Sequence, residues 1–535
     1  MKNNILKFCA AIDRATDSKR ISLLLCLLAG ALGALPYYFE ELFIFTFISL
    51  FALFYIALKQ RNGRKRFFAP FFWYFMGFYS PLYVFLSEMY PYSRFGFSED
   101  QAVFVLICSC IAIPLLHSLV SSCIMLFARF LKHDGLDFIG YASLFVINEW
   151  ILSLGMLAFP WSGVAVSLTG FLPYLQTASL FGKYFITFIT VAACFIFAKA
   201  LNNRNRLFAL ISAAIICCNY IVGSTLWFIP VDKSEPIKAS ALQGNVLSNE
   251  KWDSANKGSI FEIYIGMTED AAKSGSKIIV LPETAIPTAF VPNGIIHKEL
   301  AQIAIQYDVT IISGVHYYGE DDKYNAVIAI LPDGSLSERY DKRHLVPFGE
   351  FIPFVDFIGE VFPFVGVFNE DTSDLTEGTD PIVIETELGG VAPLVCFDSI
   401  FPEFSREAVN NGAEYIAIVT NDSWFNDSVG IYTHLRHAQL RAIENRRYVL
   451  RAANTGVSAF IDEKGSIITQ TEPLVRDFAD ASVYAIESKT LYTYIGDIFL
   501  YISFIILFGN IVYYIYLKVR RLLNGDHPTS PKRDL

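Results

Sequence analysis

The stretch Val391-Ala-Pro-Leu-Val-Cys-Phe-Asp-Ser399 reads as an apolar strand that ends at a thiol. Cys396 is the only one of the chain's nine cysteines between residues 230 and 490, so it cannot form a disulfide within that stretch. A lone thiol at a strand end is either a small buried apolar side chain or a nucleophile. Packing is the commoner role, so the other motifs of the sequence must decide between the two.

Two ionisable residues stand near the ends of other predicted strands. Glu283 follows an apolar strand in Leu281-Pro-Glu-Thr284, and Lys342 lies in Tyr340-Asp-Lys-Arg-His-Leu-Val-Pro-Phe-Gly-Glu350. Each one alone reads as surface charge. Together with Cys396 they supply a carboxylate that can take the thiol proton, an ammonium that can stabilise an oxyanion, and a nucleophile. This division of labour indicates acyl transfer through a thioester.

Residues 230–490 alternate short apolar runs with amphipathic ones, which predicts a layered α+β or α/β domain. A hairpin turn is expected at Pro332-Asp-Gly-Ser335. The predicted strands are Ile237–Gln243, Lys277–Leu281, Thr310–Val315, Asn325–Leu331, Leu336–Tyr340, Val391–Val395, Tyr415–Thr420, Val457–Asp462 and Ile467–Thr471. The predicted helices are Gly258–Ser274, His297–Tyr307, Ser405–Asn411 and Thr433–Asn445.

The remainder of the chain is strongly apolar. The whole sequence is 53% hydrophobic with a mean hydropathy of +0.41, which places it in the membrane class. A bilayer-crossing helix needs about 20 apolar residues. Eight such spans are predicted, near Ile21–Phe39, Leu42–Leu58, Phe67–Phe85, Val103–Phe127, Phe138–Phe159, Leu180–Ala200, Leu207–Phe228 and Leu491–Leu517.

Basic residues gather in alternate loops, for example Lys59–Arg66 and Lys518–Arg521, which predicts that these loops are cytoplasmic. An even number of spans then places both termini in the cytoplasm and the soluble insert outside. The net charge of −10 gives no sign of nucleic-acid binding. The expected domains are a seven-span membrane domain (1–229), an extracytoplasmic catalytic domain (230–490), the eighth span (491–517) and a cytoplasmic tail (518–535).

The motifs resemble the nitrilase (carbon–nitrogen hydrolase) superfamily, and more closely its membrane branch, the apolipoprotein N-acyltransferases. The matching stretches are Gln243-Gly-Asn245, Lys251-Trp252, Leu281–Pro287, Tyr340–Pro353, Val395-Cys-Phe-Asp398, Thr420-Asn-Asp-Ser-Trp-Phe425, Arg441–Arg446 and Ala453-Asn-Thr-Gly456. The resemblance implies a four-layer α-β-β-α sandwich. It also implies a triad of Glu283 as general base, Lys342 at the oxyanion and Cys396 as nucleophile, with no metal or cofactor.

The resemblance further implies a bacterial inner-membrane enzyme. Such an enzyme takes an acyl chain from a phospholipid and transfers it to the α-amine of an S-diacylglyceryl cysteine on an apolipoprotein. Glu350 would support the triad, and Trp252 and Trp424 would bind acyl chain or substrate; the alternatives are a surface carboxylate and two core aromatics. Phe397 and Asp398 stand where the family has Tyr-Glu, so both are candidate substrate-binding residues.

A phenylalanine-rich segment, Phe351–Phe368, follows the Lys342–Glu350 motif directly. Pulling a long acyl chain from lipid into water costs on the order of 10 kcal/mol, so an acyl donor from the bilayer requires an active site at the membrane face. A large apolar surface loop is typical of membrane contact, which predicts a lid that dips into lipid through Phe357 and Phe364. The alternative is a buried core segment.

Other classes of protein remain open from the residues alone. A membrane-tethered amidase would hydrolyse a small C–N substrate with the same triad. A Cys–His hydrolase would recruit one of three histidines, His344, His434 or His437, and the last two are spaced for a metal pair that lacks a third ligand. A catalytically dead binding module or a transporter is the non-enzymatic reading. Glu149 is the main charge inside the spans, and it either serves transport or lines a lipid or peptide access path.

Overall fold

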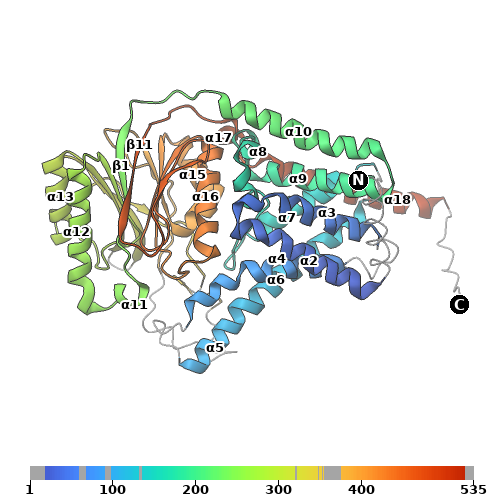
Figure 1. The fold of residues 1–535 in the computed structure, drawn as a ribbon, viewed down its shortest axis with the longest axis horizontal. Coiled ribbons are helices and arrows are strands. Elements are labelled where there is room, and N and C mark those ends of the chain that lie inside the picture. The colour runs from blue at the N-terminus through green and yellow to red at the C-terminus, as the bar shows by residue number, and fades with distance from the viewer. Residues whose placement is uncertain are drawn as a thin grey trace.

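The computed structural model describes residues 18–59, 68–90, 98–131, 135–319, 322–347, 349–351, 353–354 and 375–524. A bundle of helices and a sandwich of two β-sheets stand side by side, with one pair of helices between them (Figure 1). This is the polytopic helical domain plus α+β sandwich that the sequence predicts.

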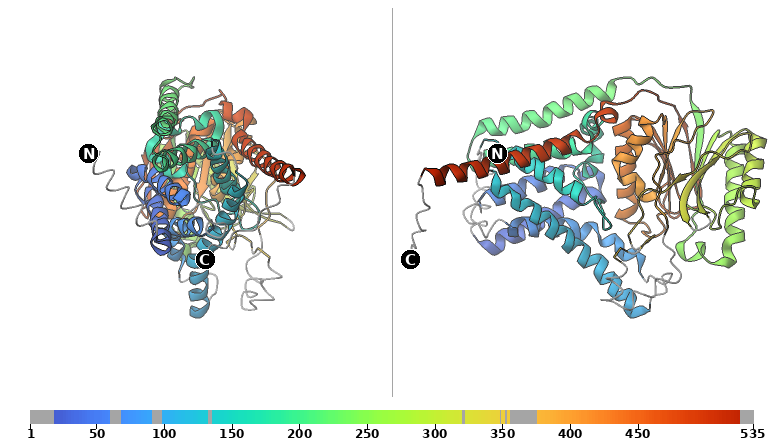
Figure 2. Two further views of the ribbon diagram at one scale, coloured as in Figure 1. Left: turned by 90° about the vertical axis from the view of Figure 1, so that its right-hand side faces the viewer. Right: turned by 180° about the vertical axis from the view of Figure 1, so that it is seen from behind.

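Helices occupy all eight predicted spans. The bundle is formed by α2 (Lys19–Tyr38), α3 (Ile44–Lys59), α4 (Phe68–Leu82), α5 (Glu99–Ile107), α6 (Ile113–Met125), α7 (Asp137–Ile151), α9 (Ala178–Asn202), α10 (Arg206–Phe228) and α18 (Ile498–Leu523). A π-helical turn, Cys108–Ala112, joins α5 to α6 in one long helical stretch. Helix α18 returns from the sandwich and packs against α7 and α9 (Figure 2).

Six helical stretches among the described residues are long and apolar enough to cross a bilayer. The other two predicted spans correspond to α4 and α7, which have 15 residues each. Fifteen helical residues measure about 22 Å, less than the ~30 Å hydrocarbon core. Helix α7 stops at Ile151 because Gly155 and Pro160 interrupt the apolar run; Gly155 has φ +74°, a conformation that glycine adopts without strain. The chain then turns back towards the sandwich.

The sandwich contains two mixed sheets. Strand order in the first is β11-β1-β2-β3-β4-β5, and in the second it is β10-β9-β8-β7-β6. The strands are β1 (Ile237–Gln243), β2 (Ile278–Leu281), β3 (Thr310–Tyr318), β4 (Lys323–Ile330), β5 (Tyr340–Asp341), β6 (Val391–Val395), β7 (Tyr415–Thr420), β8 (Tyr448–Ala453), β9 (Ala459–Ile461), β10 (Ile467–Gln470) and β11 (Asp477–Val483).

Four layers result, because each sheet has helices on its outer face. Helices α12 (Lys257–Lys273) and α13 (Ile295–Tyr307) cover the first sheet, while α15 (Pro402–Asn410) and α16 (Val429–Asn445) lie between the second sheet and the bundle (Figure 1). An apolar core that includes Val280, Val395 and Leu450 fills the space between the sheets. The strands β1–β2–β3 and β6–β7–β8 are parallel, so the carboxyl ends within each set lie at one edge.

One predicted strand of the sandwich is largely replaced by another backbone arrangement in the structure. The strand expected over Leu336–Tyr340 is reduced to β5 (Tyr340–Asp341) and an isolated bridge between Ile330 and Leu336. The backbone around Ser337 is held differently, because its amide donates to the Ala329 carbonyl and its hydroxyl accepts from the Ala329 amide. Local side-chain bonding of this kind competes with a strand ladder.

Helix α16 connects the two halves. All of its residues except Tyr432 are buried, and it packs against β8 on one side and against α9 and α2 on the other. The bundle core continues without a break into Phe397, Phe401 and Leu440 of the sandwich. The turn that carries the thiol is therefore built against the bundle.

Candidate active site

The structure brings the three predicted triad residues to one region between the two sheets. Glu283 follows β2, Lys342 follows β5 and Cys396 follows β6. The carboxylate and the ammonium are nearly inaccessible, with 7% of Glu283 and 1% of Lys342 exposed. Charges buried to this extent interact strongly with one another.

Lys342 is held by two carboxylates. Its Nζ lies 2.7 Å from Glu350 Oε2 and 3.6 Å from Glu283 Oε1. The side-chain amide of Asn325 donates to Glu283 Oε1 at 2.6 Å and to Glu350 Oε1 at 2.8 Å. The Val346 amide donates to Glu350 Oε2 at 2.9 Å, which closes the loop after Lys342 onto Glu350. Sequence reasoning missed Asn325, because its partners are brought together only by the fold.

Burial and neighbouring charges set the protonation states of Lys342 and Cys396. Burial alone would lower the pKa of the Lys342 ammonium, but Glu350 and then Glu283 outweigh it and hold that pKa above its ordinary value. Burial raises the pKa of the Cys396 thiol, the Glu283 charge raises it further, and Lys342 opposes both. Lys342 is thus a permanent cation and Cys396 rests as a thiol. Attack by sulfur therefore requires a base to remove the proton.

Cys396 occupies a sharp turn. Its φ is +49°, in the left-handed region, and it opens the 3₁₀ turn Cys396–Ile400 directly after β6. The Ser399 hydroxyl donates to the Cys396 carbonyl at 2.7 Å. Non-glycine residues in this conformation persist only where the surroundings hold them, and they cluster at functional sites.

Asp398 joins this turn to the Lys342 loop. Its carboxylate accepts from the Tyr340 hydroxyl at 2.9 Å, the His344 amide at 2.9 Å and the Val395 amide at 3.2 Å. Burial raises the pKa of Asp398 to about 6, although Lys342 and these donors act in the opposite direction. The side chain is fully buried, so it braces the Cys396 turn against the Lys342 loop and has no open face for a substrate.

Phe397 is buried as well, with 2% exposed. Its ring packs against Trp161 and Phe159 of the bundle, with centroids 6.4 Å and 6.2 Å away, and against His344 at 5.6 Å. Phe397, predicted to bind substrate, thus seats the Cys396 turn on the membrane domain.

The two predicted tryptophans occupy different settings. Trp252 is 44% exposed and stacks on His316 at 5.3 Å. Burial, helped by the Lys251 charge, lowers the pKa of His316 to about 4, so Trp252 stacks on a neutral ring. Trp424 is half-buried in the loop after β7. Phe357 and Phe364, the predicted lid contacts, lie outside the described residues.

Lys251 is a site residue that sequence reasoning left without a role. It is 1% exposed and ends the short helix α11 (Ser248–Lys251). Its Nζ donates to the Glu283 backbone carbonyl at 2.9 Å. The bond ties the segment that carries Trp252 to the segment that carries Glu283. Its position beside Trp252 in the family motif was the available signal.

Glu149 acts inside the bundle. It accepts from the Val164 amide at 2.8 Å and from the Thr187 hydroxyl at 2.9 Å. The first bond holds the segment that presents Trp161 to Phe397, and the second ties Glu149 to α9. The geometry therefore gives this charge a structural task that neither the transport nor the access-path interpretation included.

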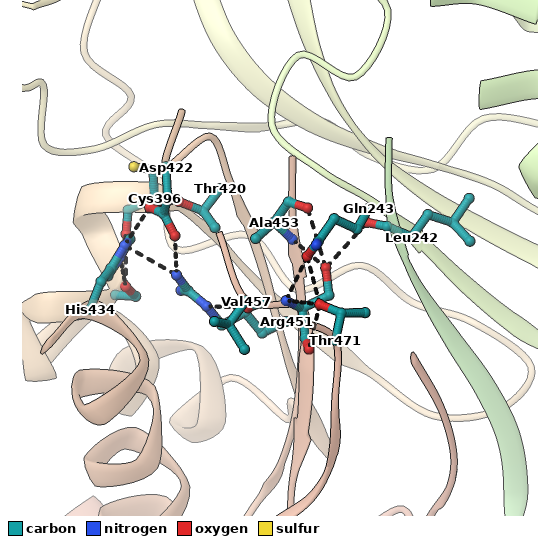
Figure 3. A network of polar contacts seen from close by, with 12 residues as sticks. Leu242, Gln243, Cys396, Thr420, Asp422, His434, Arg451, Ala453, Val457 and Thr471 are labelled. Carbon is teal, nitrogen blue, oxygen red and sulfur yellow. Dashed lines mark hydrogen bonds and ion pairs between the residues drawn. The ribbon is translucent and has the colours of Figure 1, made fainter. Parts of the chain in front are cut away.

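The Cys–His hydrolase and metal-pair alternatives both depend on the surroundings of His434. Cys396, Asp422 and His434 lie together, with one donor atom of each within 4.8 Å of the others (Figure 3). However, Asp422 Oδ1 accepts from Thr420 and lies 2.9 Å from His434 Nδ1, and Asp422 Oδ2 accepts from Arg451. Both oxygens of Asp422 and both ring nitrogens of His434 thus lie against protein partners. His437 is directed elsewhere, with Nε2 3.2 Å from the Trp161 carbonyl.

The chain is similar to known proteins over most of its length. Residues 238–485 match the carbon-nitrogen hydrolase family, and residues 29–196 match the apolipoprotein N-acyltransferase N-terminal domain. The apolipoprotein N-acyltransferase of Methylococcus capsulatus is 32% identical over 371 residues, 67% of this chain and 70% of that protein. The one from Haemophilus influenzae is 27% identical over 509 residues, 90% of this chain and 93% of that protein.

Among solved structures, Saccharomyces cerevisiae Nit3, a member of branch 10 of the nitrilase superfamily, aligns with a TM-score of 0.38 and 20% identity. That alignment covers 48% of this chain and 91% of Nit3. A carbon-nitrogen hydrolase from Helicobacter pylori aligns with a TM-score of 0.35 and 18% identity, covering 47% of this chain and 88% of that one.

Proposed function

The chain belongs to the apolipoprotein N-acyltransferase family, and from this premise we propose that its reaction runs through a thioester on Cys396. The protein is a membrane acyltransferase of lipoprotein maturation. A phospholipid is the proposed acyl donor, and the proposed acceptor amine is that of an S-diacylglyceryl cysteine. The observation that carries the proposal is the grouping of buried Glu283 and Lys342 with half-buried Cys396, whose turn is built against the membrane bundle.

In the first half-reaction, the Glu283 carboxylate removes the Cys396 proton as sulfur attacks the ester carbonyl of the phospholipid. The tetrahedral intermediate carries its negative charge on the former carbonyl oxygen, which the Lys342 ammonium stabilises. Collapse breaks the ester C–O bond. The leaving alkoxide takes the proton from Glu283 and departs as a lysophospholipid, leaving an acyl thioester on Cys396.

In the second half-reaction, the neutral α-amine of the diacylglyceryl cysteine attacks the thioester carbonyl. Glu283 accepts a proton from the nitrogen, and Lys342 again stabilises the oxyanion. Collapse breaks the C–S bond, and the thiolate recovers its proton from Glu283. The products are an N-acylated lipoprotein and the free thiol, so the enzyme ends in its starting state.

The turn that carries Cys396 packs on the bundle, and this position favours an acyl donor that stays in the bilayer. Phe397 follows Cys396 directly and packs on Trp161 and Phe159 of the membrane domain. Each CH₂ of an acyl chain is worth about 0.8 kcal/mol in lipid, so a long chain cannot leave the bilayer cheaply. Because the turn that follows Cys396 is seated on the bundle, the ester carbonyl can reach sulfur while the chain stays among apolar helices.

We further propose the membrane arrangement in which residues 1–229 and 491–517 form the spans and residues 230–490 lie on the extracytoplasmic side. Basic residues support it, since Arg520 and Arg521 end α18 and Lys59 ends α3. Both termini are then cytoplasmic, and residues 518–535 form a cytoplasmic tail. Cysteine modification by a membrane-impermeant reagent at positions introduced on each side would test this arrangement.

An assay of both products separates a transferase from a tethered amidase or lipase. Purified protein receives phospholipid, with and without a diacylglyceryl-cysteine peptide. We expect lysophospholipid and N-acyl peptide in equal amounts, and only about one turnover of lysophospholipid without the peptide. The variant Cys396→Ser is the control. Continuous lysophospholipid release without an amine would overturn the proposal in favour of hydrolysis, and full activity of Cys396→Ser would overturn the thioester.

A further inference from the structure

Beneath Cys396 lies a buried polar chain that the proposed mechanism does not use. It runs from the Cys396 turn after β6, through Asp422 after β7, to Arg451 in β8, with His434 of α16 alongside (Figure 3). The side chains of His434, Asp422 and Arg451 have no exposed surface. Three neighbouring parallel strands and the junction helix thus meet in one hydrogen-bonded network.

Arg451 and Asp422 anchor this network. Arg451 Nη2 lies 2.6 Å from Asp422 Oδ2, and Arg451 Nε donates to the Val457 carbonyl at 3.2 Å. Burial alone would raise the pKa of Asp422, but His434 and Arg451 outweigh it and lower that pKa to about 2. The aspartate is therefore a permanent carboxylate that can orient a neighbouring donor.

His434 extends the network to the nucleophile. Its Nδ1 lies 2.9 Å from Asp422 Oδ1 and 3.2 Å from Arg451 Nη2. Its Nε2 lies 3.0 Å from the Cys396 carbonyl oxygen and 2.9 Å from Ser399 Oγ. A carbonyl oxygen can only accept, and the Ser399 hydroxyl already donates to this same oxygen at 2.7 Å. Nε2 therefore carries a proton. This holds whether Nδ1 accepts from Arg451 or donates to Asp422.

This bond decides what His434 can do. The Nε2 lone pair that would take a thiol proton is replaced by an N–H, so His434 is not a base for Cys396. The N–H instead restrains the peptide group of a residue whose φ is +49°. Such conformations are maintained by surrounding contacts, and here two donors, Ser399 and His434, converge on one carbonyl.

We propose that His434 is a positioning residue for the nucleophile: its Nε2–H holds the Cys396 carbonyl, and the Asp422–Arg451 pair holds the ring. The inference rests on the proposed role of Cys396 as nucleophile. Its consequence is that the thiol keeps its orientation towards the Glu283 and Lys342 groups during both half-reactions. The effect should appear in the rate of acylation and not in donor binding, because the His434 side chain has no exposed surface.

Two amides of different reach provide the test. In His434→Gln the longer side chain can place its NH₂ near the former Nε2 position, and in His434→Asn the shorter one places it near Nδ1. Displacing a catalytic group by about 1 Å can cost 10²-fold in rate. We expect His434→Gln to acylate within about fivefold of wild type and His434→Asn about 100-fold more slowly, with KM for phospholipid unchanged in both.

His437→Asn is the matched control. His437 lies one turn further along α16, is buried to the same extent and bonds the Trp161 carbonyl, not the nucleophile. Single-turnover acylation is measured alongside alkylation of Cys396 by iodoacetamide and thermal unfolding in detergent. Slow acylation and slow alkylation in His434→Asn, with rescue in His434→Gln and a small effect of His437→Asn, would support positioning.

Two results would overturn the inference. One is equal slowing by His434→Gln and His434→Asn, which would mean that the Nε2 donor is irrelevant. The other is an effect of His437→Asn as large as that of His434→Asn, which would reduce the role to packing. Cys396→Ala keeps failure of the proposed function separate: if that variant still transfers acyl chains, the nucleophile assignment fails before His434 is tested.

Discussion

Lys342 forms its closest ion pair with Glu350 and not with Glu283, since its Nζ lies 2.7 Å from the first carboxylate and 3.6 Å from the second. Glu350 thus carries most of the task of holding the ammonium in place. Glu283 keeps an oxygen that is not committed to a short ion pair, as a general base requires. Substitutions of the two glutamates should therefore slow acylation to different extents.

Removing the base should cost more than removing the support. For Glu283→Gln we expect acylation to fall by about 10³-fold or more, within the range of general-base contributions. For Glu350→Gln we expect about 10²-fold, because Lys342 loses its closest carboxylate and the oxyanion donor is less well placed. Single-turnover acylation with KM for phospholipid measures both. Wild-type rates in Glu350→Gln would remove this residue from the site.

Asn325 donates to both carboxylates, so its replacement by an acid should be severe. Asn325→Asp puts a third carboxylate beside Glu283 and Glu350 and removes both donated hydrogen bonds. We expect acylation to fall by at least about 10²-fold and the protein to be less stable to heat. Asn411→Asp, at an exposed asparagine, is the matched control. Equal behaviour of the two variants would contradict the bridging role.

The raised pKa of Asp398 predicts that the acylation rate decreases at acidic pH. Burial raises its pKa to about 6, so this carboxylate accepts bonds fully above pH 6 and becomes protonated below it. The protonated form loses acceptor capacity for the Val395 and His344 amides that join the Cys396 turn to the Lys342 loop. Acylation should therefore fall as pH decreases through about 6.

The variant Asp398→Asn checks that assignment. It cannot titrate, and its NH₂ group faces donors, so we expect a low rate at neutral pH without the limb near pH 6. Acylation rates from pH 4.5 to 8 in both proteins provide the measurement. An unchanged limb in Asp398→Asn would assign the titration to another group.

Because Phe397 packs on Trp161 and adjoins Cys396, its removal should lower both the stability of the protein and the acylation rate. Phe397→Ala leaves a cavity between the nucleophile turn and the bundle and should destabilise the protein by about 3 kcal/mol. Acylation should fall too, because Phe397 adjoins Cys396. Ile295→Ala, at a 68% exposed side chain of α13, should change neither. Thermal unfolding in detergent and acylation rates measure the two effects. Wild-type stability and rate in Phe397→Ala would contradict the role of Phe397 in holding the Cys396 turn on the bundle.

Much of the sandwich could be predicted from strand-length apolar runs. The predicted strands Ile237–Gln243, Val391–Val395 and Tyr415–Thr420 agree with β1, β6 and β7 residue for residue. Strands β8 and β11 escaped prediction because their apolar runs contain charges: Arg451 in β8, and Asp477 and Asp480 in β11. Arg451 is tolerated in a buried strand because Asp422 neutralises it. No local pattern reveals a partner that is 29 residues away.

For the site, sequence motifs identified candidate residues but not their surroundings. Glu283, Lys342, Cys396 and Glu350 could be chosen because each stands in a recognisable stretch. Asn325, Lys251 and His434 take their roles from contacts between distant segments, as in the bond from Lys251 to the Glu283 carbonyl. Similarly, Phe397 and Asp398 read as pocket residues in a linear motif, and only packing against the bundle and the Lys342 loop shows both to be buried.

The thioester is the central claim, and the mass of the intact protein tests it most directly. Wild type and Cys396→Ala are incubated with phospholipid in detergent and then with a diacylglyceryl-cysteine peptide. The account predicts one added acyl mass on wild type alone, which the peptide removes while water does not within the same time. Absence of the adduct, or equal loss of it in water alone, would contradict the account.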